Sequence, residues 1–150
     1  MDSLLDRRAL LCAAATLTAA AAAVLPAALA CEFDADTLTV THPWTRATAA
    51  DAPFAVVSMK FSRVTTADRL IGVITPVARG AELGGPEGPR ELGFELLPGR
   101  DAELAEAGVH LRLTGLRQAL ELGRSYPMQL VFERGGVVRA TLNVDFPAAA

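Results

Sequence analysis

The chain has few side chains of the kinds that hold metal ions or act as nucleophiles. Its 150 residues include two cysteines, two histidines, three methionines and one tryptophan. The two histidines, His42 and His110, lie far apart with no cysteine pair beside them, so no zinc-type spacing occurs. The sequence also contains no glycine-rich phosphate loop and no Ser or Cys nucleophile motif with a paired His. We therefore predict that the protein is not an enzyme.

Lysine is almost absent, and the basic residues form no stripe. Lys60 is the only lysine, the arginines are scattered, and the formal net charge is −3. Nucleic-acid-binding domains usually carry clustered basic residues on one face. We therefore expect no nucleic-acid partner.

The first 30 residues have the pattern of an export signal. Arg7 and Arg8 precede an alanine-rich apolar run at 9–25, and Ala28 and Ala30 supply the small residues that a signal peptidase reads. We predict a signal peptide over 1–30 and one domain over 31–150 that is exported to the periplasm. The alternative is a membrane anchor, but the run is barely long enough to span and has no basic flank after it. The arginine pair leaves Sec or twin-arginine export open.

Cys31 is the first residue after the predicted cut. A lipoprotein signal requires Cys at this position, so lipidation of Cys31 stays open, and only then would the protein attach to a membrane. Cys12 would be removed with the signal, which leaves one thiol and no intramolecular disulfide. The fold would then depend on its apolar core.

Alternating apolar and polar residues dominate after Cys31 and predict strands. The segments are 38–41, 54–61, 70–74, 109–116, 128–133 and 138–146. Gly135-Gly136 predicts a hairpin turn, and in the last strand the residues from Val138 to Phe146 that alternate with polar ones are expected on one face. We interpret 99–108 as a strand, because ten residues between glycines make a weak helix, and 80–98 as a Gly- and Pro-rich loop. The pattern predicts an all-β, antiparallel sandwich.

Four segments of the chain resemble four motifs of one known family, in the same order. They are 41–48 (THPWTRAT), 67–73 (ADRLIGV), 108–116 (GVHLRLTGL) and 115–123 (GLRQALELG). They resemble the motifs H-P-W-x-R-A/P-T, A-D-R-L-V-G-V, G-G-Y-H-x-M-L-x-G-L and G-L-K-x-P-L-x-x-G of the periplasmic copper chaperone family PCu(A)C. The resemblance implies a cupredoxin-like β-sandwich that binds Cu(I) and delivers it towards cytochrome oxidase, with oxidase assembly factors as partners.

The copper ligands implied by the resemblance are mostly missing. His110 matches the His of the family's His-x-Met, but Arg112 stands in place of the Met. Gly84 stands where the family has its first ligand His, and Pro86 where a Met follows. The fixed charge of Arg112 would repel a cation about 4 Å away by about 4 kcal/mol at an effective dielectric constant of about 20. The predicted metal contacts are therefore His110, with Cys31 and His42 as helpers.

Two functions remain open. The first is a copper chaperone of this family; the second is a divergent paralogue that no longer binds copper and acts as a protein-interaction or ligand-binding module. Arg112 and the Gly-Pro segment favour the second, and the charge of Arg112 raises the hypothesis that Arg112 with His110 binds an anion instead of a cation. His110 is expected on an exposed strand face, whereas Met59 and Met128 fall on apolar faces and are expected in the core.

Overall fold

We describe residues 31–147 in a computed structural model of the chain. The chain divides into two units, Met1–Cys31 and Glu32–Ala150, and the second is described by itself. The predicted signal peptide lies outside the described residues. Residues 31–147 contain no helix, and thus none that is long and apolar enough to cross a membrane.

The second unit is built from strands alone. They are β1 (Glu32–Asp34), β2 (Thr39–Arg46), β3 (Phe54–Ser62), β4 (Asp68–Ile74), β5 (Ala78–Gly84), β6 (Arg90–Glu91), β7 (Phe94–Leu96), β8 (Ala102–Leu104), β9 (His110–Leu116), β10 (Ser125–Phe132) and β11 (Gly136–Phe146). Their order in the sheet is β6-β5-β9-β3-β2-β11-β10-β4-β7, with β1 on β2 and β8 on β3. The predicted all-β fold is confirmed.

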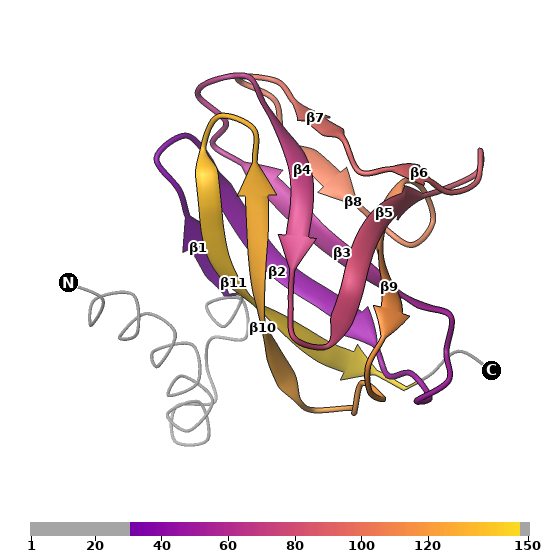
Figure 1. Cartoon of the computed structure of the whole chain (residues 1–150). Coiled ribbons are helices and arrows are strands. Elements are labelled where there is room, and N and C mark those ends of the chain that lie inside the picture. Colours follow the sequence, from indigo (N-terminus) through magenta and orange to yellow (C-terminus); the bar gives the residue numbers. More distant parts are fainter. Residues whose placement is uncertain (1–30, 148–150) are drawn as a thin grey trace, which may run out of the picture. The chain divides into compact units, whose positions relative to one another are not determined.

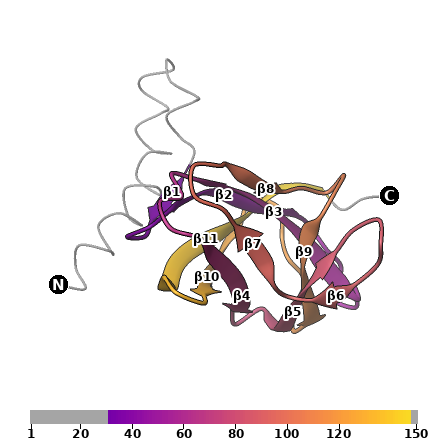
Figure 2. The same cartoon turned by 90° about the horizontal axis from the view of Figure 1, so that it is seen from above.

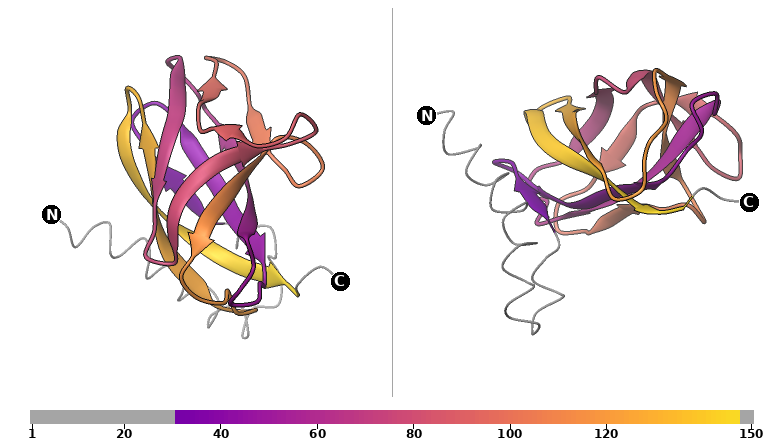
Figure 3. Two further views of the ribbon diagram at one scale, coloured as in Figure 1. Left: turned by 45° about the vertical axis from the view of Figure 1, so that its right-hand side comes forward. Right: turned by 90° about the horizontal axis from the view of Figure 1, so that it is seen from below.

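The sheet curls until its two halves face each other. A single bridge between Thr75 and Ala78 links the end of β4 to the start of β5, so strands from distant parts of the order meet. Figure 1 shows β4 and β5 in front of β2 and β3, and Figure 2, seen from above, shows these two pairs of strands on opposite sides of the curl. Figure 3 shows the same curl from two further sides. All described strand pairs are antiparallel except β2 with β11, which run parallel.

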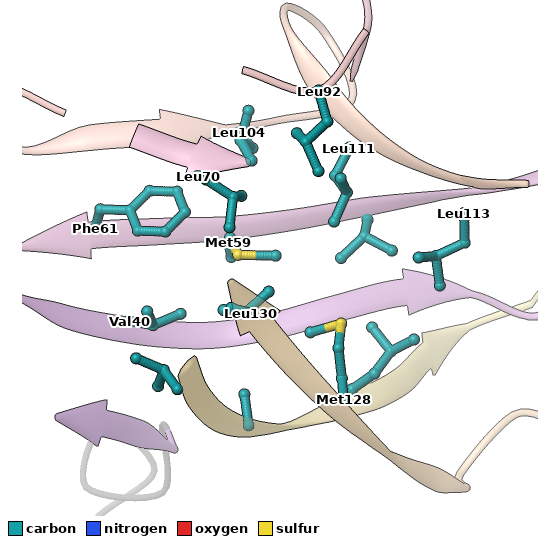
Figure 4. Packing of buried hydrophobic residues seen from close by; sticks show 14 of the residues in the cluster. Val40, Met59, Phe61, Leu70, Leu92, Leu104, Leu111, Leu113, Met128 and Leu130 are labelled. Atoms are coloured by element: carbon teal, nitrogen blue, oxygen red, sulfur yellow. The ribbon is translucent and has the colours of Figure 1, made fainter. Parts of the chain in front are cut away.

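The inner side of this curl is the hydrophobic core. Alternation in β3 places Ala55, Val57, Met59 and Phe61 inside, each at most 2% exposed. Met59 and Met128 lie among leucines, valines and Phe61, as the apolar pattern predicts (Figure 4). A flexible thioether fills such irregular gaps well. Both sulfur atoms are therefore committed to packing.

Two sequence-based expectations about strands are wrong. The segment predicted as a loop, 80–98, contains the end of β5 and all of β6 and β7, because each can pair with a neighbouring strand despite its glycines. Phe146 does not join the inner face of β11. The register of β11 against β2 shifts between Val144 and Phe146, so Phe146 turns outward, is 48% exposed and packs against Trp44. By contrast, 99–108 does contain a strand, β8, as expected.

Candidate functional site

The candidate site lies on the outer side of the sheet, where β5 and β9 pair. In this antiparallel ladder Gly84 stands opposite His110, and Glu82 opposite Arg112. Residues directly opposite on such strands project to the same side. The pairing therefore brings together three of the positions that the sequence analysis singled out: Gly84, His110 and Arg112.

His110 makes a hydrogen bond with each ring nitrogen. Nδ1 lies 3.0 Å from the carbonyl oxygen of Gly108, and Nε2 lies 3.2 Å from Nε of Arg112. Arginine has only donors, so Nε2 of His110 must accept and Nδ1–H must donate to Gly108. The imidazole is therefore held as the neutral Nδ1–H tautomer, and the lone pair that a metal would need is directed at a guanidinium.

His110 is buried, contrary to the expectation of an exposed position. Its exposed fraction is 8%, although it belongs to the outer side of β9. The turn that precedes β9 is closed by hydrogen bonds from Ala105 N to Val109 O and from Gly108 N to Ala105 O. This turn and the Arg112 side chain lie against the ring. Alternation alone predicts the face of a side chain, but not what covers that face.

Arg112 is fixed from two directions. Its Nε–H donates to His110, and its Cζ lies 4.2 Å from the centre of the Phe54 ring. Phe54 begins β3, where it pairs with Thr114 of β9. A guanidinium over an aromatic face is attracted by the ring quadrupole. Phe54 was not predicted as part of the site; the available signal was an aromatic residue on the polar side of its strand.

Gly84 is needed because this space is full. A Cβ atom at Gly84 would collide with Nε of Arg112 and lie 2.5 Å from Nε2 of His110. The missing side chain at 84 and the long one at 112 therefore compensate each other. The Arg112 side chain occupies the volume into which a ligand at 84 would project.

The other two predicted metal contacts, His42 and Cys31, do not belong to the strand pair β5 and β9. His42 sits in β2 at a register shift, with φ of 47°, and its Nε2 lies 2.9 Å from Oδ2 of Asp145 on β11. The strand β3 separates β2 from β9 in the sheet. Cys31 is the last residue of the first unit. Within residues 31–147 no group of three or more His, Cys, Asp or Glu side chains is placed to hold a metal ion.

The donor set does not fit Cu(I). A soft cation takes thioether, thiolate or imidazole ligands. At this site one imidazole is available, its lone pair already accepts a hydrogen bond, and the neighbouring group carries a permanent positive charge. The sulfur atoms of Met59 and Met128 are buried in the core. What the arrangement can do chemically is offer positive charge and N–H donors.

A hollow of about 240 Å³ opens next to Gly84. It is lined by Gly84, Gly85, Pro86, Glu87, Gly88, Arg90 and Val109. The loop after β5 forms most of its wall. In this loop, Nη1 of Arg90 lies 3.7 Å from Oε2 of Glu87. The site therefore has a small adjoining space as well as a charge.

The chain is similar to several known domains. The LpqE-like family model, described as a lipoprotein family, matches residues 38–144. The copper-bound PCuAC domain from PmoF2 is 28% identical, with 77% of this chain and 98% of that chain covered and a TM-score of 0.71. The apo PCuAC domain from PmoF1 is 30% identical, with 77% and 99% covered and a TM-score of 0.70.

More distant structures share the fold. The Cu(I)-bound form of DR1885 from Deinococcus radiodurans is 18% identical, with 76% of this chain and 80% of that chain covered and a TM-score of 0.60. No curated protein matches the chain.

Proposed function

We propose that this chain, which belongs to the LpqE-like family and whose domain belongs to the PCuAC domains, is an exported binding module that does not bind copper. In this proposal, the guanidinium of Arg112 takes the place of a copper ion beside His110. The carrying observation is the 3.2 Å contact between Nε of Arg112 and Nε2 of His110. The contact uses the one imidazole lone pair that the family motif retains. The wild-type domain is therefore expected to leave Cu(I) with a competing chelator.

Gly84 supports the same conclusion from the opposite strand. A histidine at 84, as in the family motif, would require Arg112 to leave its observed position, because even a Cβ collides with its Nε. The two departures from the motif are thus physically linked. A linked pair of departures favours a rebuilt site over one that has merely lost a ligand.

A second candidate function is Cu(I) carriage in the periplasm, with delivery to oxidase assembly factors. It is favoured by the 28% identical PmoF2 domain, which is copper-bound, and by the retention of His110. It requires the Arg112 side chain to leave His110 and a further soft ligand to arrive. Neither candidate involves catalysis.

The test is a Cu(I) titration against a chromogenic chelator. We expect wild type and His110→Ala to leave the chelator complex intact. Gly84→His combined with Arg112→Met restores two ligand types and removes the charge, so this double variant should withdraw about one equivalent of Cu(I). The same double variant is the positive control of the titration, because it tests whether the folded domain can hold Cu(I) once these ligands are present. Stoichiometric retention by wild type that is lost in His110→Ala would establish the carrier function instead.

Attachment to a membrane through Cys31 is a separate proposal. The family's description as a lipoprotein agrees with Cys at the first position after the predicted signal. The test is a detergent phase-separation assay. We expect the exported wild-type protein to partition into the detergent phase and the Cys31→Ser variant to remain in the aqueous phase. Equal partitioning of the two would argue for an unlipidated protein.

A further inference from the structure

The guanidinium of Arg112 has donors that the site does not use. Its Nε–H donates to His110, whereas the terminal nitrogens have no hydrogen-bond or ion-pair partner within residues 31–147. Glu82 stands opposite on β5 but forms no ion pair with it. Four other arginines of residues 31–147 pair with carboxylates, namely Arg46, Arg69, Arg90 and Arg124, and the remaining six form no ion pair there. What distinguishes Arg112 is that a buried histidine and an aromatic ring hold its guanidinium while its terminal nitrogens have no partner.

The contacts of Arg112 leave one edge of its guanidinium group available to a ligand. The Nε side faces His110, and one flat face lies on Phe54. The edge formed by the two terminal nitrogens remains, and it presents two parallel N–H donors. That edge matches a planar carboxylate in bidentate geometry. Phe54 and His110 fix its direction in advance, so little side-chain entropy would be lost on binding.

We propose that this site binds a carboxylate anion through the terminal nitrogens of Arg112, beside the hollow at Gly84. The inference rests on the proposed function, since a bound copper ion would require Arg112 to leave. The position at which the family resemblance implies a cation would then hold an anion here. Charge, donor geometry and the missing Cβ at Gly84 all follow from the same two residue changes.

The surroundings limit the ligand to a small, singly charged carboxylate. The hollow of about 240 Å³ is below the usual size range of drug-sized ligand pockets. Glu82 faces Arg112 across the ladder, and Glu87 lines the hollow, where Arg90 pairs with it at 3.7 Å. These two carboxylates would oppose a multiply charged anion more than a single carboxylate. A free small acid and the carboxyl terminus of a peptide both meet the requirement.

The test is an NMR titration of the exported protein, free of metal, that follows the arginine Nε–H and histidine ring signals. Acetate is added at constant ionic strength against chloride, and acetamide serves as the neutral isostere. We expect a saturable shift at Arg112 and His110 with acetate and none with acetamide. Arg112→Met should abolish it, while Arg112→Lys, which keeps charge but loses the fork, should weaken binding about tenfold. The control Arg100→Met changes an exposed arginine outside the site.

A second pair of probes separates the two sources of carboxylate. An acetylated dipeptide with a free carboxyl terminus is compared with its amidated form. Binding of the free form about tenfold tighter than acetate would identify a chain terminus, and equal binding would identify small acids; either supports the site. Shifts that persist in Arg112→Met, or that acetamide reproduces, would overturn it.

Failure of this inference is distinct from failure of the proposed function. A protein that neither retains Cu(I) nor responds to acetate would overturn the carboxylate site alone. A wild-type protein that retains Cu(I) through His110 would overturn both. Melting curves of each variant show whether a lost shift reflects lost binding or lost structure.

Discussion

Two polar side chains of this domain are buried to the same extent but have different kinds of hydrogen-bond partner. Asp68 and His110 are each 8% exposed. The carboxylate of Asp68 accepts from three main-chain amides, those of Arg69 and Arg134 at 2.8 Å and that of Gly135 at 2.9 Å. The ring of His110 meets one main-chain carbonyl and one side chain.

The difference separates a structural site from a binding site. Asp68 joins the first residue of β4 to the turn between β10 and β11, and its partners cannot move without unfolding that turn. Arg112 contacts His110 through its side chain alone, and that contact is part of no strand pairing. Burial alone therefore does not identify a functional group; the kind of partner, main chain or side chain, does.

Replacement of Asp68 should have the largest effect on stability. Asp68→Ala removes three charge-assisted hydrogen bonds and leaves buried amides unpaired, so we expect a loss of about 3 kcal/mol in the free energy of unfolding. Asp68→Asn keeps an acceptor and should lose less. Urea denaturation measures both, with the exposed Asp101→Ala as control. A loss below about 1 kcal/mol would mean that water replaces the carboxylate and that the contrast with His110 is false.

The strands show how far the sequence predicts this molecule. Alternation is a local property, and it placed Ala55 to Phe61 and Val138 to Val144 on the correct faces. It failed at Phe146, because a register shift against β2 reverses the alternation. It also failed for the segment 80–98, where β6 forms a short hairpin with β5 and β7 pairs with β4, a strand more distant in sequence.

The site shows the same limit more sharply. Residue identity and the family motif directed attention to Gly84, His110 and Arg112, and pairing of β5 with β9 brings them together. The burial of His110 could not be predicted, since it arises from a turn and a side chain that lie over the strand. Asp68 was noted only as part of a motif, because its partners are amides of a turn more than 60 residues away.

The second prediction concerns the match between Gly84 and Arg112. Gly84→Ala should force the end of Arg112 away from His110 and lower the free energy of unfolding by about 1 kcal/mol, the net value of one such hydrogen bond. The cost should fall in an Arg112→Ala background, where only the close contact with Nε2 of His110 remains, so the double-mutant cycle should show a coupling of a part of that size. Gly93→Ala is the control, because a Cβ there meets only ordinary contacts. Additive costs would show that the two positions do not compensate each other.

The smallest effect is expected at Phe54, which holds Arg112 without a hydrogen bond. Phe54→Leu keeps the apolar contact and removes the cation–π attraction, which is about 0.5 to 1 kcal/mol at a partly exposed site. Stability should barely change, while carboxylate affinity should fall about two- to fivefold in the NMR titration. The matched control is Phe146→Leu, where Arg46 lies 5.4 Å from the ring but is already paired with Glu106. Because Arg46 has a carboxylate and Arg112 has none, only the first change should alter binding; equal losses would place the carboxylate between both arginines.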